Sequence, residues 1–380
     1  MIPCTRMMEG KSTVHSDRIG GPLFVWNISS KCNLRCVHCY SDSEASPEGR
    51  ELTDDKCVQL VDEISALKPP IVLLSGGEPL MRKNVFDIIR TCKSKGLRVG
   101  LSTNGTLIDK DMAEKIAASG VDYAGVSIDG REELHDGLRG SKGSSASSWK
   151  AIERLNSLGV KTGIRFTLTD NNKEDLFYAL EKALRSGAKR FCLYHLVYAG
   201  RASASMDMEL SEKRELMKKF FGAVREIASG GHDFEVLTTD SPADGPYMMS
   251  HILNGEASHR HCNDEVLMGP HGGCSAGERI VYLDSTGDVY PCQFLRDESL
   301  GNVTRSSLSD IWGGRVGNAL LAALRAKHEY LEGRCARCAH KKKCAGCRAR
   351  AKSLYGSLWA EDPACYLEES DITDAVMSRA

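Results

Sequence analysis

Short apolar stretches that favour β-strands alternate, along the first half of the chain, with longer stretches that carry apolar residues at helical spacing. The expected strands span residues 23–28, 71–74, 99–102, 123–127, 162–167 and 190–195. The expected helices between them span residues 53–67, 85–95, 110–119, 148–158 and 173–186. A strand followed by a helix recurs every roughly 25 to 35 residues, which is typical of parallel βαβ units.

Six such units predict an α/β fold built on a partial (β/α)6 barrel, because a complete barrel of this type has eight. In such barrels the chemistry lies at the carboxyl ends of the strands. The expected divisions of the chain are an N-terminal extension (1–21), the barrel (22–201), a bridging region (202–266) with a helix over 211–228, and a cysteine-rich C-terminal module (267–380) that contains a β-hairpin over 279–290.

The charge balance narrows the class of protein. Lys and Arg total 50 and Asp and Glu total 51, so the chain lacks the basic excess of a nucleic-acid binder. No apolar run approaches the roughly 18 residues of a membrane span, and the charged first 20 residues do not resemble a secretory signal. We therefore expect a cytoplasmic protein. In that reducing compartment, 15 cysteines indicate metal binding or redox chemistry rather than disulfides.

Three of these cysteines form a compact group directly after the first expected strand. Cys32, Cys36 and Cys39 are separated by three and then two residues and are followed by Tyr40. Three thiolates on one short loop can ligate three irons of a [4Fe-4S] cluster and leave the fourth iron open to a substrate or cosubstrate. The alternative is a zinc site in which His38 is the fourth ligand.

A second motif follows the second strand, where Gly76, Gly77, Glu78 and Pro79 stand in sequence. Together with the cysteine loop, it makes residues 22–201 resemble the radical S-adenosylmethionine (SAM) superfamily. The resemblance implies that the glycine motif meets the aminium group of SAM and that Arg139 pairs with the SAM carboxylate. The residues it assigns to SAM binding are Tyr40, Gly76, Gly77, Glu78, Ser102, Asn104, Ser127, Asp129 and Arg139. For Ser102, Asn104 and Asp129, helix capping or turn formation is the alternative role.

The same resemblance implies reductive chemistry. An electron enters the cluster and cleaves SAM to methionine and a 5'-deoxyadenosyl radical. That radical takes a hydrogen atom from an unactivated carbon of the substrate, so the barrel must exclude water and other hydrogen donors.

The C-terminal cysteines resemble the SPASM extension of radical SAM enzymes, although Cys344 and Cys347 are separated by two residues where the family usually has three. The resemblance implies two auxiliary [4Fe-4S] clusters, and so three clusters in total. The outer cluster is assigned to Cys335, Cys338, Cys344 and Cys365, and the inner one to Cys274, Cys292 and Cys347. The fourth inner ligand is Cys262, unless that iron is open. Zinc in four-cysteine sites is the alternative for the whole module.

Three further stretches, at 195–201, 243–247 and 359–366, resemble the tetrapyrrole-modifying branch of this superfamily, which includes the NirJ, AhbC and AhbD types. The AhbD type is the best match, and it implies a haem synthase that decarboxylates two propionates of iron-coproporphyrin III oxidatively to vinyl groups, giving haem b. The alternatives are the AhbC type, which removes acetates from 12,18-didecarboxysiroheme to give iron-coproporphyrin III, and a SPASM maturase that modifies a peptide.

An iron-tetrapyrrole substrate requires cations for its carboxylates, and possible iron ligands can be named. The candidate cations are Arg165, Arg201 and Arg260, and the candidate iron ligands are His195, His259, His261 and His271. Residues 334–352 carry eight Lys or Arg and no acid, so they could dock an acidic electron donor such as a flavodoxin or ferredoxin. The alternative is a solvated basic face.

Overall fold

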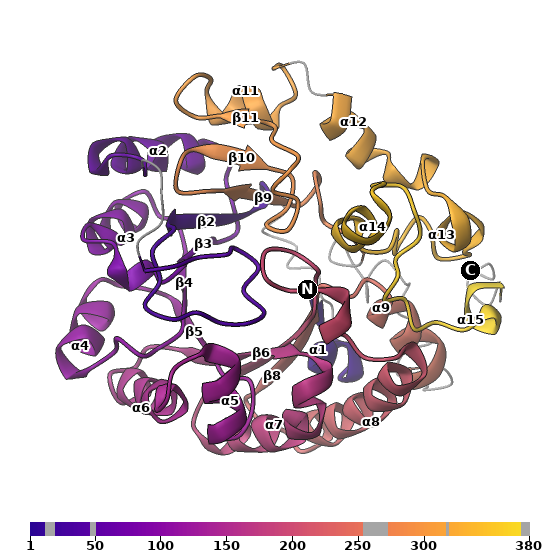
Figure 1. Ribbon diagram of the computed structural model, residues 1–380. Coiled ribbons are helices and arrows are strands. Elements are labelled where there is room, and N and C mark those ends of the chain that lie inside the picture. The colour runs from indigo at the N-terminus through magenta and orange to yellow at the C-terminus, as the bar shows by residue number, and fades with distance from the viewer. Residues whose placement is uncertain (12–19, 46–50, 254–272, 317–318, 374–380) are drawn as a thin grey trace.

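The computed structural model of the protein describes residues 1–11, 20–45, 51–253, 273–316 and 319–373. These residues form one sheet in the strand order β1-β8-β7-β6-β5-β4-β3-β2-β9-β10-β11. Its central strands all run parallel and curve into an open barrel (Figure 1). They are β2 (Leu23–Ser29), β3 (Val72–Gly76), β4 (Val99–Thr103), β5 (Tyr123–Ser127), β6 (Thr162–Leu168), β7 (Arg190–His195) and β8 (Glu235–Thr239).

Helices follow the strands and lie in an arc on the outer side of the sheet (Figure 1). They are α2 (Asp54–Ala66), α3 (Val85–Ser94), α4 (Lys110–Ala118), α5 (Glu132–Arg139), α6 (Ser144–Ser157), α7 (Leu176–Arg185) and α8 (Leu210–Ser229). Local caps fix where some of them begin: the side chain of Thr53 accepts from Lys56 N at α2, and that of Asp109 accepts from Met112 N at α4. The partial barrel predicted from the strand and helix pattern is confirmed.

The barrel continues beyond the six strands that the sequence predicts. Strand β8 is a seventh parallel strand, paired with β7, and it lies in the bridging region, where the sequence predicts only a helix. The N-terminal residues also join the sheet, because β1 (Ile2–Pro3) pairs antiparallel with β8 and α1 (Cys4–Met8) follows it. Both segments are too short and too mixed in composition for a hydrophobic period to show.

The C-terminal module extends the opposite edge of the same sheet. Strands β9 (Ile280–Leu283) and β10 (Asp288–Tyr290) form the predicted hairpin, and β9 pairs in parallel with β2. The last strand is β11 (Gly301–Asn302), and the α-helices of the module are α11 (Leu308–Trp312), α12 (Ala319–Arg325), α13 (Gly333–Arg337), α14 (Arg348–Tyr355) and α15 (Glu369–Thr373). The short α9 (Asp244–Tyr247) precedes them. Continuous pairing from β8 to β11 therefore fixes the module against the barrel.

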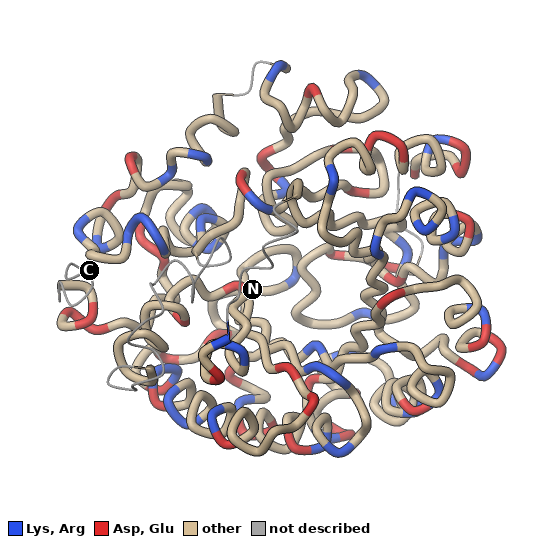
Figure 2. The backbone as a smooth tube through the Cα atoms, turned by 180° about the vertical axis from the view of Figure 1, so that it is seen from behind, with Lys and Arg blue, Asp and Glu red and all other residues tan. Residues whose placement is uncertain are grey.

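Acidic and basic residues are interspersed over the outer helices (Figure 2), in keeping with the formal net charge of -1. Within the described part of the chain, none of the helices has the length and apolar character needed to span a membrane.

Candidate active site

The cysteine loop lies at the carboxyl end of β2, at the mouth of the barrel. Cys32 and Cys36 are buried and pack together with Cys39. All three line a cavity that opens at this end of the sheet. Burial raises the pKa of Cys32 to about 12, so a positive partner is needed to hold it as a thiolate. Iron supplies such a charge, and the thiol donors fit an iron-sulfur cluster.

The glycine motif lies directly against the cysteine loop. Gly77 N donates to Ser29 O at 2.8 Å, and Glu78 N donates to Lys31 O at 2.7 Å. A Cβ atom at Gly77 would lie 2.3 Å from Lys31 O and 2.8 Å from Cys32 Cβ. A larger residue would therefore push the two loops apart, so the sequence motif is a packing requirement as well as a possible ligand contact.

Glu78 joins the ends of β3 and β4. Its buried carboxylate accepts from Leu80 N at 3.1 Å, from Thr103 Oγ1 at 2.8 Å and from Asn104 N at 2.8 Å. Burial raises the pKa of Glu78 to about 7 despite these donors. Glu78 is not among the residues that line the cavity, so in this structure it holds the two loops that do.

Arg139, at the end of α5, reaches the cysteine loop. Its Nη2 lies 2.5 Å from Asp129 Oδ2, and its Nη1 donates to Cys36 Sγ at 3.6 Å. His38 approaches the same Asp129 oxygen at 3.4 Å. Asp129 is fully buried and does not line the cavity, whereas Arg139 does. The aspartate thus orients the arginine.

The other residues expected to bind SAM surround the same cavity. Those that line it are Tyr40, Gly76, Gly77, Ser102, Asn104 and Ser127. Ser102 and Ser127 stand at or beside the last residues of β4 and β5. The ring of Tyr40 packs edge-on against Phe294, which comes from the C-terminal module, at 5.5 Å between centroids. The barrel and the module therefore share one cavity.

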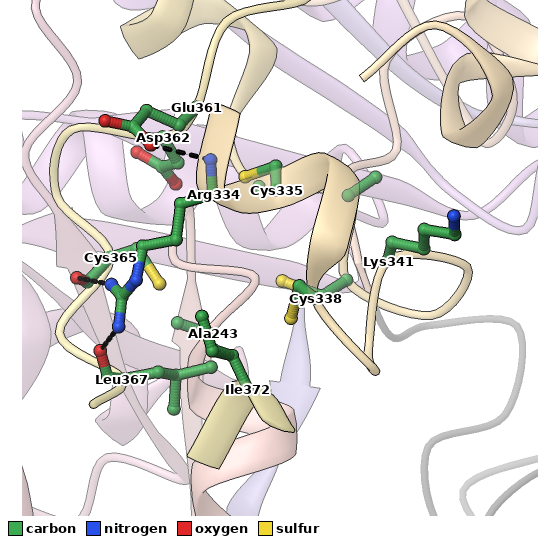
Figure 3. A pocket seen from close by; sticks show the side chains of 13 residues that line it. Ala243, Arg334, Cys335, Cys338, Lys341, Glu361, Asp362, Cys365, Leu367 and Ile372 are labelled. Carbon is green, nitrogen blue, oxygen red and sulfur yellow. Dashed lines mark hydrogen bonds between the residues drawn. The ribbon is translucent and has the colours of Figure 1, made fainter. Parts of the chain in front are cut away.

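The four cysteines assigned to the outer cluster meet around a second, smaller cavity (Figure 3). Two of them lie in α13 and directly after it, one in the loop before α14 and one in the segment before α15, and they are Cys335, Cys338, Cys344 and Cys365. Arg334 holds the last of these segments by donating to the carbonyl oxygens of Cys365 and Leu367. The resemblance assigns Cys365, far along the chain, to the same cluster as the other three, and the structure places all four around one cavity.

The three cysteines assigned to the inner cluster are also brought together. Cys347 packs with Cys274 and Cys292 in one apolar cluster beside the barrel. Cys347 N donates to Asp362 Oδ2 at 2.7 Å, which fixes this part of the loop. The proposed fourth ligand, Cys262, lies outside the described residues, as do Arg260, His259, His261 and His271.

Comparison with known proteins agrees with this geometry. The model of the radical SAM superfamily matches residues 26–183, and that of the iron-sulfur cluster-binding SPASM domain matches residues 274–339. A Fe-coproporphyrin III synthase of Methanosarcina barkeri is 37% identical over 357 residues, covering 92% of this chain and 89% of that protein. The chain belongs to the radical SAM superfamily.

Other relatives of this radical SAM enzyme also carry the names of enzymes that make tetrapyrroles. A pre-heme d1 synthase of Dinoroseobacter shibae is 34% identical and covers 92% of this chain and 87% of that protein. An AdoMet-dependent heme synthase of Methanosarcina barkeri is 33% identical and covers 90% and 95%. Streptococcus suis SuiB bound to S-adenosylmethionine shares the fold, with a TM-score of 0.71 at 18% identity over 92% of this chain and 78% of that one. Radical SAM chemistry with [4Fe-4S] clusters and SAM follows from membership.

The three stretches that resemble the tetrapyrrole branch converge at the ends of β7 and β8 in this radical SAM enzyme. His195 Nε2 lies 3.0 Å from Asp244 Oδ2, and Tyr366 donates to Asp244 Oδ1 at 2.7 Å. Asp362 forms a bidentate pair with Arg350, which also donates to Leu196 O at 3.1 Å. All five side chains of these pairs are buried, so His195 is held by its aspartate.

The basic segment 334–352 differs from its prediction. Arg348 and Arg350 are buried: Arg348 donates to Leu358 O at 2.8 Å and to Ala360 O at 2.7 Å, and Arg350 binds Asp362. These arginines fix the module from within and do not belong to a basic face. Tyr194 and Thr167, which no sequence motif singles out, also line the cavity, at positions late in β7 and β6 where a barrel places its chemistry.

Proposed function

We propose that this radical SAM enzyme decarboxylates two propionate side chains of iron-coproporphyrin III oxidatively to vinyl groups and so makes haem b. The observation that carries the proposal is the contact of Asp244 with both His195 and Tyr366. It joins the three stretches that resemble the tetrapyrrole branch at one wall of the cavity. The relatives named AdoMet-dependent heme synthase, at 30% to 33% identity, support this reaction.

The residues of the site would have distinct tasks in this reaction. Cys32, Cys36 and Cys39 would hold a [4Fe-4S] cluster, and the glycine motif and Arg139 would hold SAM beside it. When bound, this pair supplies the 5'-deoxyadenosyl radical that removes a hydrogen atom from each propionate. Each propionate would then lose carbon dioxide and one electron to become a vinyl group, and the inner cluster held by Cys274, Cys292 and Cys347 would be the acceptor of that electron. The Tyr40–Phe294 contact packs the barrel against the module beside the cavity, which would help to exclude water from it.

A second candidate is the formation of iron-coproporphyrin III, by removal of acetate side chains from 12,18-didecarboxysiroheme. It is favoured by the identity of 37% with the Fe-coproporphyrin III synthase, which exceeds the 33% shared with the heme synthase from the same organism. The two reactions lie on either side of one compound, which is the substrate of the first and the product of the second.

We also propose three [4Fe-4S] clusters, two of them in the SPASM domain. The grouping of Cys335, Cys338, Cys344 and Cys365 around one cavity supports the outer cluster, and the packing of the inner cysteines supports the other. A flavodoxin or ferredoxin is the proposed electron donor. The proposed cytoplasmic location rests on the described cysteines, none of which forms a disulfide.

Anaerobic incubation with SAM and a reductant tests the function. Iron-coproporphyrin III and 12,18-didecarboxysiroheme are supplied in separate reactions, and the pigments are identified by mass spectrometry. Formation of haem b from iron-coproporphyrin III supports the haem synthase. Formation of iron-coproporphyrin III from 12,18-didecarboxysiroheme, with no haem b from the first substrate, supports the second candidate. If neither pigment changes, and SAM is cleaved only in a further reaction that contains a peptide, the enzyme is a peptide maturase. A Cys36→Ala variant is the control for conversion without SAM cleavage.

A further inference from the structure

Three arginines line the barrel cavity, and they differ in how their guanidinium groups are occupied. Arg139 is paired with Asp129. Arg201 donates to Cys36 O at 2.8 Å and to Asp42 Oδ1 at 2.7 Å, so it braces the cysteine loop. Among the residues that the structure describes, none accepts a hydrogen bond from Arg165 or forms an ion pair with it.

The fold holds Arg165 in place without using its donors. It lies in the middle of β6, opposite Ser127 of β5 and Cys192 of β7. Its stem passes over Gly125, where a Cβ atom would lie 2.9 Å from Arg165 Cδ. The guanidinium carbon lies over the ring of Tyr194, 4.4 Å from its centroid. This cation–π contact uses none of the N–H groups as hydrogen-bond donors, so they remain available to the cavity.

The group keeps its charge in this setting. Burial lowers the pKa of Arg165, but Tyr194 and Cys192 raise it, followed by Tyr123 and Tyr40, and the net shift is upward. Asp240 also lines the cavity, yet it forms no ion pair with Arg165. A guanidinium that is charged, held over a tyrosine ring and open to a cavity matches a carboxylate, which accepts two parallel hydrogen bonds from it.

We propose that Arg165 binds a carboxylate side chain of the tetrapyrrole and thereby positions the substrate in the barrel. This inference rests on the proposed function, because both candidate substrates carry several carboxylates. A carboxylate could also come from SAM. Arg139 is bound to Asp129 and touches the cysteine loop, whereas Arg165 lies a strand further around the barrel, which favours the tetrapyrrole as the source.

The test compares Arg165→Ala and Arg165→Lys with an Arg190→Ala control. Arg190 lies over the ring of Tyr123 at 4.9 Å in the same manner, but it is paired with Glu235 and does not line the cavity. Binding of iron-coproporphyrin III is measured by titration of its absorbance, and binding of SAM by equilibrium dialysis. Iron octaethylporphyrin, which has no carboxylates, is the third probe. All proteins carry their clusters, and their melting temperatures are compared.

We expect Arg165→Ala to weaken iron-coproporphyrin III binding by roughly 10-fold to 100-fold, the effect of a lost charge-assisted pair. Arg165→Lys should fall in between, and it also serves if the Ala variant does not fold. The Arg190→Ala control, SAM binding and iron octaethylporphyrin binding should stay unchanged.

Two results would overturn the assignment of Arg165. One is unchanged binding of iron-coproporphyrin III, with or without weaker SAM binding, and the other is equal weakening of the porphyrins with and without carboxylates. If the wild-type protein binds no tetrapyrrole at all, the proposed function itself is wrong, which is a different outcome.

Discussion

Arg139 and Asp129 form an ion pair, Nη2 to Oδ2 at 2.5 Å, between the end of α5 and the loop after β5. Asp129 is fully buried, and the neighbouring arginine and His38 keep the pKa of this carboxyl below its usual value in spite of its burial. Its Oδ1 accepts from Thr167 N at 3.0 Å, so the pair also connects β5 to β6. Arg139, which lines the cavity, is thus fixed by Asp129, which does not line it.

Arg139→Ala should lower the free energy of unfolding by about 3 to 5 kcal/mol, because it leaves the buried Asp129 charge without its partner. It should also weaken SAM binding by roughly 10-fold or more if the arginine pairs with the SAM carboxylate. Urea unfolding and equilibrium dialysis measure the two effects. A loss below about 1 kcal/mol would show that Asp129 is solvated or neutral.

Replacing Cys32, Cys36 and Cys39 together by Ala should abolish SAM cleavage and leave the SPASM domain intact. Three clusters correspond to about twelve irons per chain, so the variant should retain about eight. Iron analysis and 5'-deoxyadenosine formation are the measurements. About eight irons in the wild-type protein would show that one of the proposed auxiliary clusters is absent. SAM cleavage by the variant would contradict the role of Cys32, Cys36 and Cys39 in holding the cluster that cleaves SAM.

Gly77→Ala should separate the glycine motif from the cysteine loop, since the added Cβ would lie 2.3 Å from Lys31 O. We expect a loss of about 1 to 3 kcal/mol in stability, together with weaker SAM binding. Gly222 in α8 is the control, because nothing lies within 4 Å of a Cβ atom there and Ala favours the helix. Gly222→Ala should be neutral or stabilising, and equal effects of the two changes would refute the packing argument.

The stability should fall on acidification because of His135. Burial is the largest cause that lowers the pKa of His135, to about 4, with Arg139 next. Its Nδ1 accepts from Asp129 N at 3.0 Å, which needs a neutral ring. The unfolded chain binds this proton near pH 6.5 and the folded chain does not, so unfolding becomes easier below that pH.

At pH 5, protonation of His135 in the unfolded chain should lower the free energy of unfolding by about 2 kcal/mol relative to neutral pH. The matched variant is His135→Asn, whose side-chain oxygen can accept the same hydrogen bond without titrating. Urea unfolding between pH 7.5 and pH 5 should therefore give a steeper loss for the wild-type protein than for the variant. Parallel curves would contradict a buried, neutral His135.

The sequence predicts the parts of the fold that depend on local pattern. The apolar runs of β2 to β7 and the cysteine and glycine motifs show directly in it. Strand β8 is not predicted, because its five residues, in a stretch rich in Gly and His, are too few to show a regular pattern of apolar positions. The inward course of Arg348 and Arg350 depends on carbonyl and carboxylate partners that only the tertiary fold supplies.

The most direct test of the account is isotope transfer from the substrate to the product of SAM. The enzyme is incubated anaerobically with SAM, reductant and iron-coproporphyrin III deuterated on its propionate carbons, and the mass of the 5'-deoxyadenosine is measured. The haem synthase account predicts 5'-deoxyadenosine that carries one deuterium, together with haem b. Unlabelled 5'-deoxyadenosine in the presence of bound iron-coproporphyrin III would contradict it.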